Sequence, residues 1–183
     1  YRWSYRLSRL LLSEILTDEL RGHSLPIPDF LKRRVISFRQ HHFFVKRDGV
    51  NEATWDHVEQ GYFKALDGMT SALGDRPFLL GDAPSLADFG LMAPMLRHFG
   101  QDPTPAEIMR TRAPAVYAWV ARMWDVRTDK TPKFIDKVST DLNPLLKEAC
   151  ETHLEQLTTN AAAFGAGQTS FAMTVQRCQY TNM

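Results

Sequence analysis

Six histidines and two cysteines are the side chains of this sequence best suited to metal or thiol chemistry. The histidines are scattered, and the adjacent pair His41 and His42 would point in different directions on a helix. No H-E-x-x-H or C-x-x-C spacing occurs, so the sequence indicates no metal site. It also has no G-x-S-x-G elbow and no Gly-rich phosphate loop. We therefore name no catalytic residue within this chain.

The two cysteines, Cys150 and Cys178, are too few for a disulfide framework in 183 residues, which favours a reducing, cytoplasmic location. Cys150 falls on an expected helix at a position that could face its neighbours. We expect a buried, inert thiol there, with a reactive thiol as the alternative. Cys178 falls on an expected strand and gives no further indication.

The charge balance and hydropathy exclude two classes of partner. With 22 basic and 21 acidic residues the net charge is +1, which gives no support for nucleic-acid binding. The basic cluster Lys32, Arg33 and Arg34 is expected to be a solvated helix face, with a phosphate-contacting patch as the alternative. No apolar run approaches the roughly 20 residues that cross a bilayer, so no membrane partner is expected.

The most informative local chemistry is the pair Ser85 and Asp88, three residues apart at the start of an expected helix. This spacing predicts a capping box, in which the Asp88 carboxylate reaches back to the backbone N–H of Ser85. Pro84 and Phe89, five residues apart, have the spacing of a hydrophobic staple. We expect these four residues to be a structural device rather than a catalytic one.

Hydrophobic periodicity predicts the elements that position this pair. Helices are expected over about 5–20, 30–46, 51–73, 85–99, 113–127 and 143–159. Residues 101–112 are expected to be a loop, with at most one helical turn near 105–110. Pro94 predicts a kink in its helix, and Gly61 predicts the close approach of a neighbouring helix.

The segment 171–180 alternates apolar and polar residues, which predicts a strand. A single strand needs a partner, which we expect either beyond Met183 or in a segment that the sequence does not reveal. The sequence thus predicts a helical domain over 1–127 and an extension over 128–183. The expected fold class is all-α, a bundle of five to six helices with a short extension that holds a helix and a strand.

Residues 77–100, PFLLGDAPSLADFGLMAPMLRHFG, closely resemble the signature of the all-helical C-terminal domain of glutathione transferases. In that family an aromatic-Leu-hydrophobic-Gly segment leads into an S/T-x-x-D cap. The counterparts here are Phe78–Gly81, then Ser85 and Asp88. The resemblance continues in APAVYAWVARM at 113–123. The opening YRW and the extra C-terminal elements resemble a bacterial subgroup of larger glutathione-transferase-like proteins.

This resemblance implies a partner domain and a reaction. Family members carry a thioredoxin-like N-terminal domain that binds glutathione as co-substrate and supplies the activating residue, and that domain is expected to be missing from this chain. The helical half would bind an apolar electrophile and share in a homodimer interface. This fragment is expected to bind no cofactor and to be inactive alone. Two alternatives stay open: a non-catalytic interaction or scaffolding module, and a reductive or isomerase activity in the same superfamily.

Four residues are candidates for contact with substrate. The resemblance implies that the first helix faces the cleft between the two domains. Trp3, Tyr5 and Arg6 would therefore line the substrate pocket or, alternatively, pack against the missing domain. His98, on the expected kinked helix, is the fourth candidate.

Overall fold

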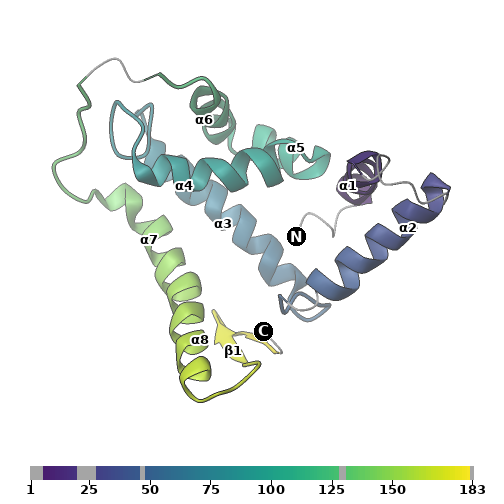
Figure 1. Cartoon of the computed structure of the whole chain (residues 1–183). Helices are drawn as coiled ribbons and strands as arrows, with labels where there is room; N and C mark the ends of the chain where they lie inside the picture. Colours follow the sequence, from purple (N-terminus) through teal and green to yellow (C-terminus); the bar gives the residue numbers. More distant parts are fainter. Residues whose placement is uncertain (1–5, 20–27, 46–47, 128–130, 182–183) are drawn as a thin grey trace. The chain divides into compact units, whose positions relative to one another are not determined.

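The computed structural model describes residues 6–19, 28–45, 48–127 and 131–181 of the chain (Figure 1). Contacts within the chain form two compact units, which are described separately below. The first unit holds residues 1–59 and 156–183, and the second holds residues 60–155. The all-α fold class is confirmed, while the predicted division near residue 127 stays a prediction.

The first unit begins with two helices that pack against each other. Helix α1 spans Arg6–Glu19 and helix α2 spans Asp29–Arg39, and α2 continues in a π-helical turn over Gln40–Val45. Because the π turn follows α2 without a break, hydrophobic periodicity predicts a single helix over this segment. Leu12 and Thr17 of α1 are buried, and Arg33 of α2 lies 3.3 Å from Glu14 of α1.

The second unit is built around four helical segments. They are α3 (Trp55–Leu73), which starts in the first unit, α4 (Leu86–Pro94) with a π-helical continuation over Met95–Gly100, α5 (Pro103–Arg112) and α6 (Pro114–Trp124). Their apolar faces form a core in which the following side chains are almost wholly buried: Leu66, Met69, Leu79, Met109, Val116 and Trp119.

Two expectations for this unit need correction, and a third stays a prediction. Residues 103–112, expected as a loop, are helix α5, because Pro103 at the first helical position has a φ suited to a helix start. Pro94 stands inside α4 and π-helical residues follow it, while the kink expected there stays a prediction. A Cβ added at Gly61 would meet no atom of another segment within 4 Å in the described part of the chain, so no close approach explains this glycine. Gly68 has that role instead, because a Cβ there would lie 2.9 Å from Leu145 Cδ2.

The C-terminal helix runs past its expected end. It comprises α7 (Asn143–Ala149), a π-helical stretch over Cys150–Leu154, and α8 (Glu155–Gly165). The alanines at 161–163 are strong helix formers and extend it to Gly165. Cys150 is exposed, against the expectation of a buried thiol, because this stretch of the helix has no buried residue.

The expected strand at 171–180 is a hairpin. Strand β1 (Met173–Val175) pairs antiparallel with β2 (Cys178–Tyr180), with Met173 opposite Tyr180 and Val175 opposite Cys178. Gln176 and Arg177 form the turn with φ values of 48° and 70°. The segment therefore pairs with itself, and the sheet has two strands among the residues that the structure describes (Figure 1).

Candidate functional site

The second unit is organised around the carboxylate of Asp88, which is completely buried. Its Oδ2 accepts the backbone N–H of Ser85 at 2.9 Å and the Ser85 hydroxyl at 2.6 Å. Its Oδ1 accepts the backbone N–H of Leu79 at 2.9 Å and the indole N–H of Trp119 at 2.9 Å. One side chain thus joins the turn before α4, the first turn of α4 and the middle of α6.

These four hydrogen bonds explain how a carboxylate can stay buried. An unpaired buried charge is strongly unfavourable, but a carboxylate with two acceptor oxygens can satisfy four donors. The acidic group also lies in the first turn of α4, where the helix dipole favours negative charge. Removing it would leave the N–H groups of Leu79, Ser85 and Trp119 without this acceptor, at roughly 1–3 kcal/mol for each buried donor. We refer to Asp88 with Leu79, Ser85 and Trp119 as the Asp88 node.

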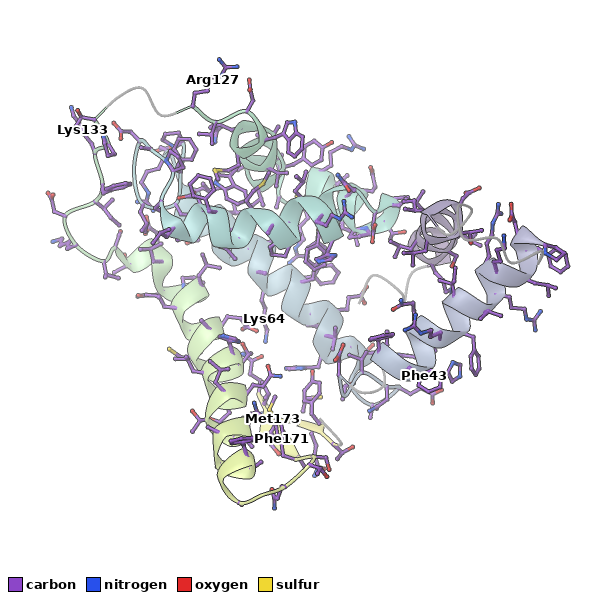
Figure 2. The ribbon with its side chains drawn as sticks, viewed as in Figure 1. Phe43, Lys64, Arg127, Lys133, Phe171 and Met173 are labelled. Atoms are coloured by element: carbon purple, nitrogen blue, oxygen red, sulfur yellow. The ribbon has the colours of Figure 1, made fainter. Side chains whose placement is uncertain are left out.

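Gly81, in the turn that leads to the node, is required by a neighbouring backbone. A Cβ at this position would collide with the carbonyl oxygen of Lys133, the residue labelled in Figure 2. The φ of Gly81, 154°, is also disfavoured for other residues. Three hydrogen bonds hold the two segments together. The N–H of Asp82 donates to Lys133 O at 3.1 Å, the N–H of Lys133 donates to Asp82 Oδ1 at 2.7 Å, and the N–H of Ile135 donates to Leu80 O at 2.9 Å.

The first unit presents an exposed apolar face on α2 and the π turn after it. Val35, Phe38 and Phe43 are 64%, 57% and 51% exposed, and Figure 2 labels Phe43. The Phe38 ring stacks on His42 with centroids 4.0 Å apart, and the Arg39 guanidinium lies 5.3 Å from the centre of the Phe44 ring. This aromatic face has the character of a surface that binds an apolar group or a protein.

An open groove of about 540 Å³ lies beside this turn. It is lined by His41, His42, Val50, Asn51, Glu52, Ala53 and Trp55.

Within the described residues, no group of three or more His, Cys, Asp or Glu side chains is placed to hold a metal ion. No described helix is both long enough and apolar enough to cross a membrane.

Comparison with known families identifies the part of the chain that contains the Asp88 node. Residues 52–122 match the family model of the glutathione S-transferase C-terminal domain. This part of the chain is therefore similar to a glutathione S-transferase C-terminal domain. No curated protein and no solved structure matches the chain.

The matched residues include all four residues of the Asp88 node, and Gly81 as well. It extends from the turn before α3 to near the end of α6. Helices α1 and α2 precede the matched residues, and α7, α8 and the hairpin follow them. The family signature in the sequence therefore coincides with the residues that hold this fold together.

The predicted substrate-contacting residues remain predictions. Trp3 and Tyr5 lie outside the described residues. Arg6 is the first residue of α1, and its side chain also lies outside the described part. His98 is exposed on the π-helical continuation of α4, in the second unit. Phe89, the expected staple partner of Pro84, is 53% exposed.

Sequence reasoning missed Trp119 as a partner of Asp88. Helical periodicity shows that Trp119 faces a core, and the structure adds that its indole N–H reaches the carboxylate 31 residues earlier. A buried tryptophan normally needs an acceptor for its N–H, so the sequence could have indicated that Trp119 has a hydrogen-bond partner. It could not name the acceptor, because the pairing depends on how α4 and α6 pack.

Proposed function

We propose that this chain is the helical, hydrophobic-substrate-binding half of a glutathione transferase-like protein. The observation that carries the proposal is the family match over residues 52–122, which include the Asp88 node. Joined to a thioredoxin-like domain, the protein would conjugate glutathione to an apolar electrophile. That domain would position the glutathione sulfur and activate it as a thiolate, which then attacks the electrophile.

The exposed aromatic face of α2 supports an apolar co-substrate. Phe38, Phe43 and Phe44 are each about half exposed or more, which is unfavourable in water unless something covers them. In the proposed protein, α1 and α2 would line the cleft against the thioredoxin-like domain, with Trp3, Tyr5 and Arg6 beside it. A homodimer and a cytoplasmic location are parts of the same proposal.

The first experiment is to read the coding sequence upstream of Tyr1 for about 100 codons, the size of a small domain. The proposal expects a thioredoxin-like pattern there, with an activating Ser, Tyr or Cys. The longer protein is then assayed for conjugation of reduced glutathione to an aromatic electrophile. Conjugation supports the enzyme, whereas a longer protein that lacks this pattern and this activity supports the interaction module instead.

A pair of variants of the longer protein tests the apolar wall. Phe38→Ser should raise the KM for the electrophile and leave the KM for glutathione unchanged. Arg33→Ala, on the same helix, is the matched control, because its partner Glu14 lies on α1 in an exposed ion pair. If the KM for the electrophile is unchanged in both variants, the electrophile does not bind at the aromatic face of α2, even if the enzyme is active.

A further inference from the structure

A groove inside the first unit lies between the C-terminal hairpin and the start of α3. It has a volume of about 520 Å³, within the range of small-molecule sites. One wall comes from residues 51–57 and the other from residues 176–181, and most of the lining residues are polar. A groove of this size and polarity suits a small polar molecule.

Hydrogen bonds through His57 join the two walls. The Tyr180 hydroxyl lies 2.6 Å from His57 Nδ1, and Oε1 of Gln176 lies 3.3 Å from His57 Nε2. Both nitrogens of the imidazole therefore contact the hairpin, which holds the hairpin against the first turn of α3. A groove whose walls are already held in place loses little conformational entropy when a ligand binds.

The wall that precedes α3 is also held by its own side chains. Asn51 Oδ1 accepts the backbone N–H of Ala53 at 2.9 Å, and Asn51 Nδ2 donates to the carbonyl oxygen of Gly49 at 3.2 Å. The Thr54 hydroxyl donates to the same carbonyl oxygen at 2.9 Å. The amide of Asn51 is therefore engaged within its own wall, and the charged side chains of the lining are the stronger candidates for contact with a ligand.

Two opposite charges line the groove, one on each wall. Asp56 lies in the first turn of α3 and Arg177 in the hairpin turn, and both residues are exposed. Neither side chain forms an ion pair or a hydrogen bond with another described residue. The groove thus presents a carboxylate and a guanidinium that no described residue neutralises.

The position of Arg177 in the turn favours other residue types. Gln176 and Arg177 have left-handed φ values of 48° and 70°, which suit Gly and Asn better than Gln and Arg. The Gln176 side chain contacts His57 from this position, but Arg177 has no such contact among the described residues. Residues held in unfavourable conformations cluster at ligand-binding positions. The conformation of Arg177 therefore supports a partner for its guanidinium outside the chain.

The two charges together indicate the class of ligand. A simple anion would be attracted by Arg177 and repelled by Asp56, and a simple cation would meet the reverse. Each charge therefore selects against a ligand of the opposite kind. A molecule that carries both an ammonium group and a carboxylate gains from both residues and is repelled by neither when each group lies on its own wall.

We propose that this groove binds a small zwitterion, an α-amino acid or a short peptide, with its ammonium group at Asp56 and its carboxylate at Arg177. The guanidinium can bind a carboxylate through two parallel hydrogen bonds. The Gln179 amide, also in the lining, can pair with a peptide bond. This inference is independent of the proposed transferase function, because every residue that carries it belongs to the hairpin or to the start of α3.

An NMR titration of the isotope-labelled full chain tests the proposal. The probes are alanylalanine, its N-acetyl form without the ammonium group, its C-terminal amide without the carboxylate, and free alanine. We expect the backbone signals of residues 51–57 and 176–181 to shift, and each capped form to bind about fivefold more weakly than the zwitterion. Alanine that binds as tightly as alanylalanine identifies an amino acid as the ligand, and weaker alanine identifies a peptide. Equal affinity for the three peptide forms, or shifts confined to other residues, would overturn the proposal.

Two variants assign the charges. In Asp56→Asn, alanylalanine and its N-acetyl form should bind equally, because the ammonium group has lost its partner. In Arg177→Gln, alanylalanine and its amide should bind equally. Arg97→Gln, at an exposed arginine of the second unit, is the matched control and should leave every affinity unchanged. A variant that keeps the full preference for the zwitterion would overturn the role of its residue. The comparison of the three peptide forms on the wild-type chain needs no variant, so it decides even if a variant unfolds.

Discussion

The indole N–H of Trp119 donates a hydrogen bond of 2.9 Å to Oδ1 of Asp88, and both side chains are completely buried. This contact ties the middle of α6 to the N-terminus of α4. Because Asp88 also holds the N–H groups of Leu79 and Ser85, the contact belongs to a network rather than to an isolated pair. Its energetic contribution can therefore be measured by substitution at either end.

Trp119→Phe should lower the free energy of unfolding by about 1–3 kcal/mol, because it removes one donor to a buried carboxylate and keeps most of the ring. A double-mutant cycle with Asp88→Ala, which removes the acceptor, isolates the pair, and we expect a coupling energy of about 0.5–3 kcal/mol. Urea unfolding followed by circular dichroism gives the four values. Strictly additive effects would contradict a direct energetic link between the two residues.

Gly81→Ala should lower the free energy of unfolding by roughly 1–3 kcal/mol, because the new Cβ would collide with the carbonyl oxygen of Lys133. Gly61→Ala is the matched control, since a Cβ at this position in helix α3 would meet no atom of another described segment within 4 Å. There, alanine should raise stability by about 0.5–1 kcal/mol. Thermal unfolding of both variants checks the pair, and a stabilising Gly81→Ala would contradict the close approach of residues 131–136.

Lowering the pH should reduce the stability of the second unit, because the Asp141 carboxylate becomes protonated. The Arg76 guanidinium lies 2.9 Å from Asp141, and its hydrogen bond holds the pKa of this carboxyl below the ordinary value of 3.8. Since the folded pKa is lowered, the pair stabilises the fold above about pH 4 and stops doing so as the pH falls through the folded value. Asp141→Asn should therefore reduce stability at pH 6 but not at pH 2. Urea midpoints at the two pH values measure this, and an equal loss at both would contradict the ion pair.

The parts of the fold that depend on neighbouring residues were predictable. Ser85 and Asp88 are three residues apart, so their backbone hydrogen bond follows from local geometry, whereas Trp119 reaches Asp88 only through tertiary packing. Helix α5 was missed because its apolar residues are few and its proline-rich start is also typical of a loop. The sequence predicts one strand rather than a hairpin because Gln176 and Arg177 lack the Asn-Gly chemistry of such turns.

The candidate site was less predictable than the fold. The interpretation of residues 77–123 as part of a glutathione S-transferase C-terminal domain is confirmed by the family match. The contact between His57 and Tyr180 spans 123 residues, and no periodicity or motif connects them. Contacts of this range are set by the packing of whole elements, so a single sequence gives no indication of them.

The central claim is that the hydrogen bonds of the Asp88 node stabilise the second unit. The most direct test compares the urea unfolding midpoints of two variants. Asp88→Ala removes the acceptor of three N–H donors and should lower the free energy of unfolding by about 3–5 kcal/mol. Arg33→Ala removes only an exposed ion pair with Glu14 and should change it by about 0.5 kcal/mol or less. A much lower midpoint for Asp88→Ala alone is the predicted result, and equal midpoints for the two variants would contradict the account.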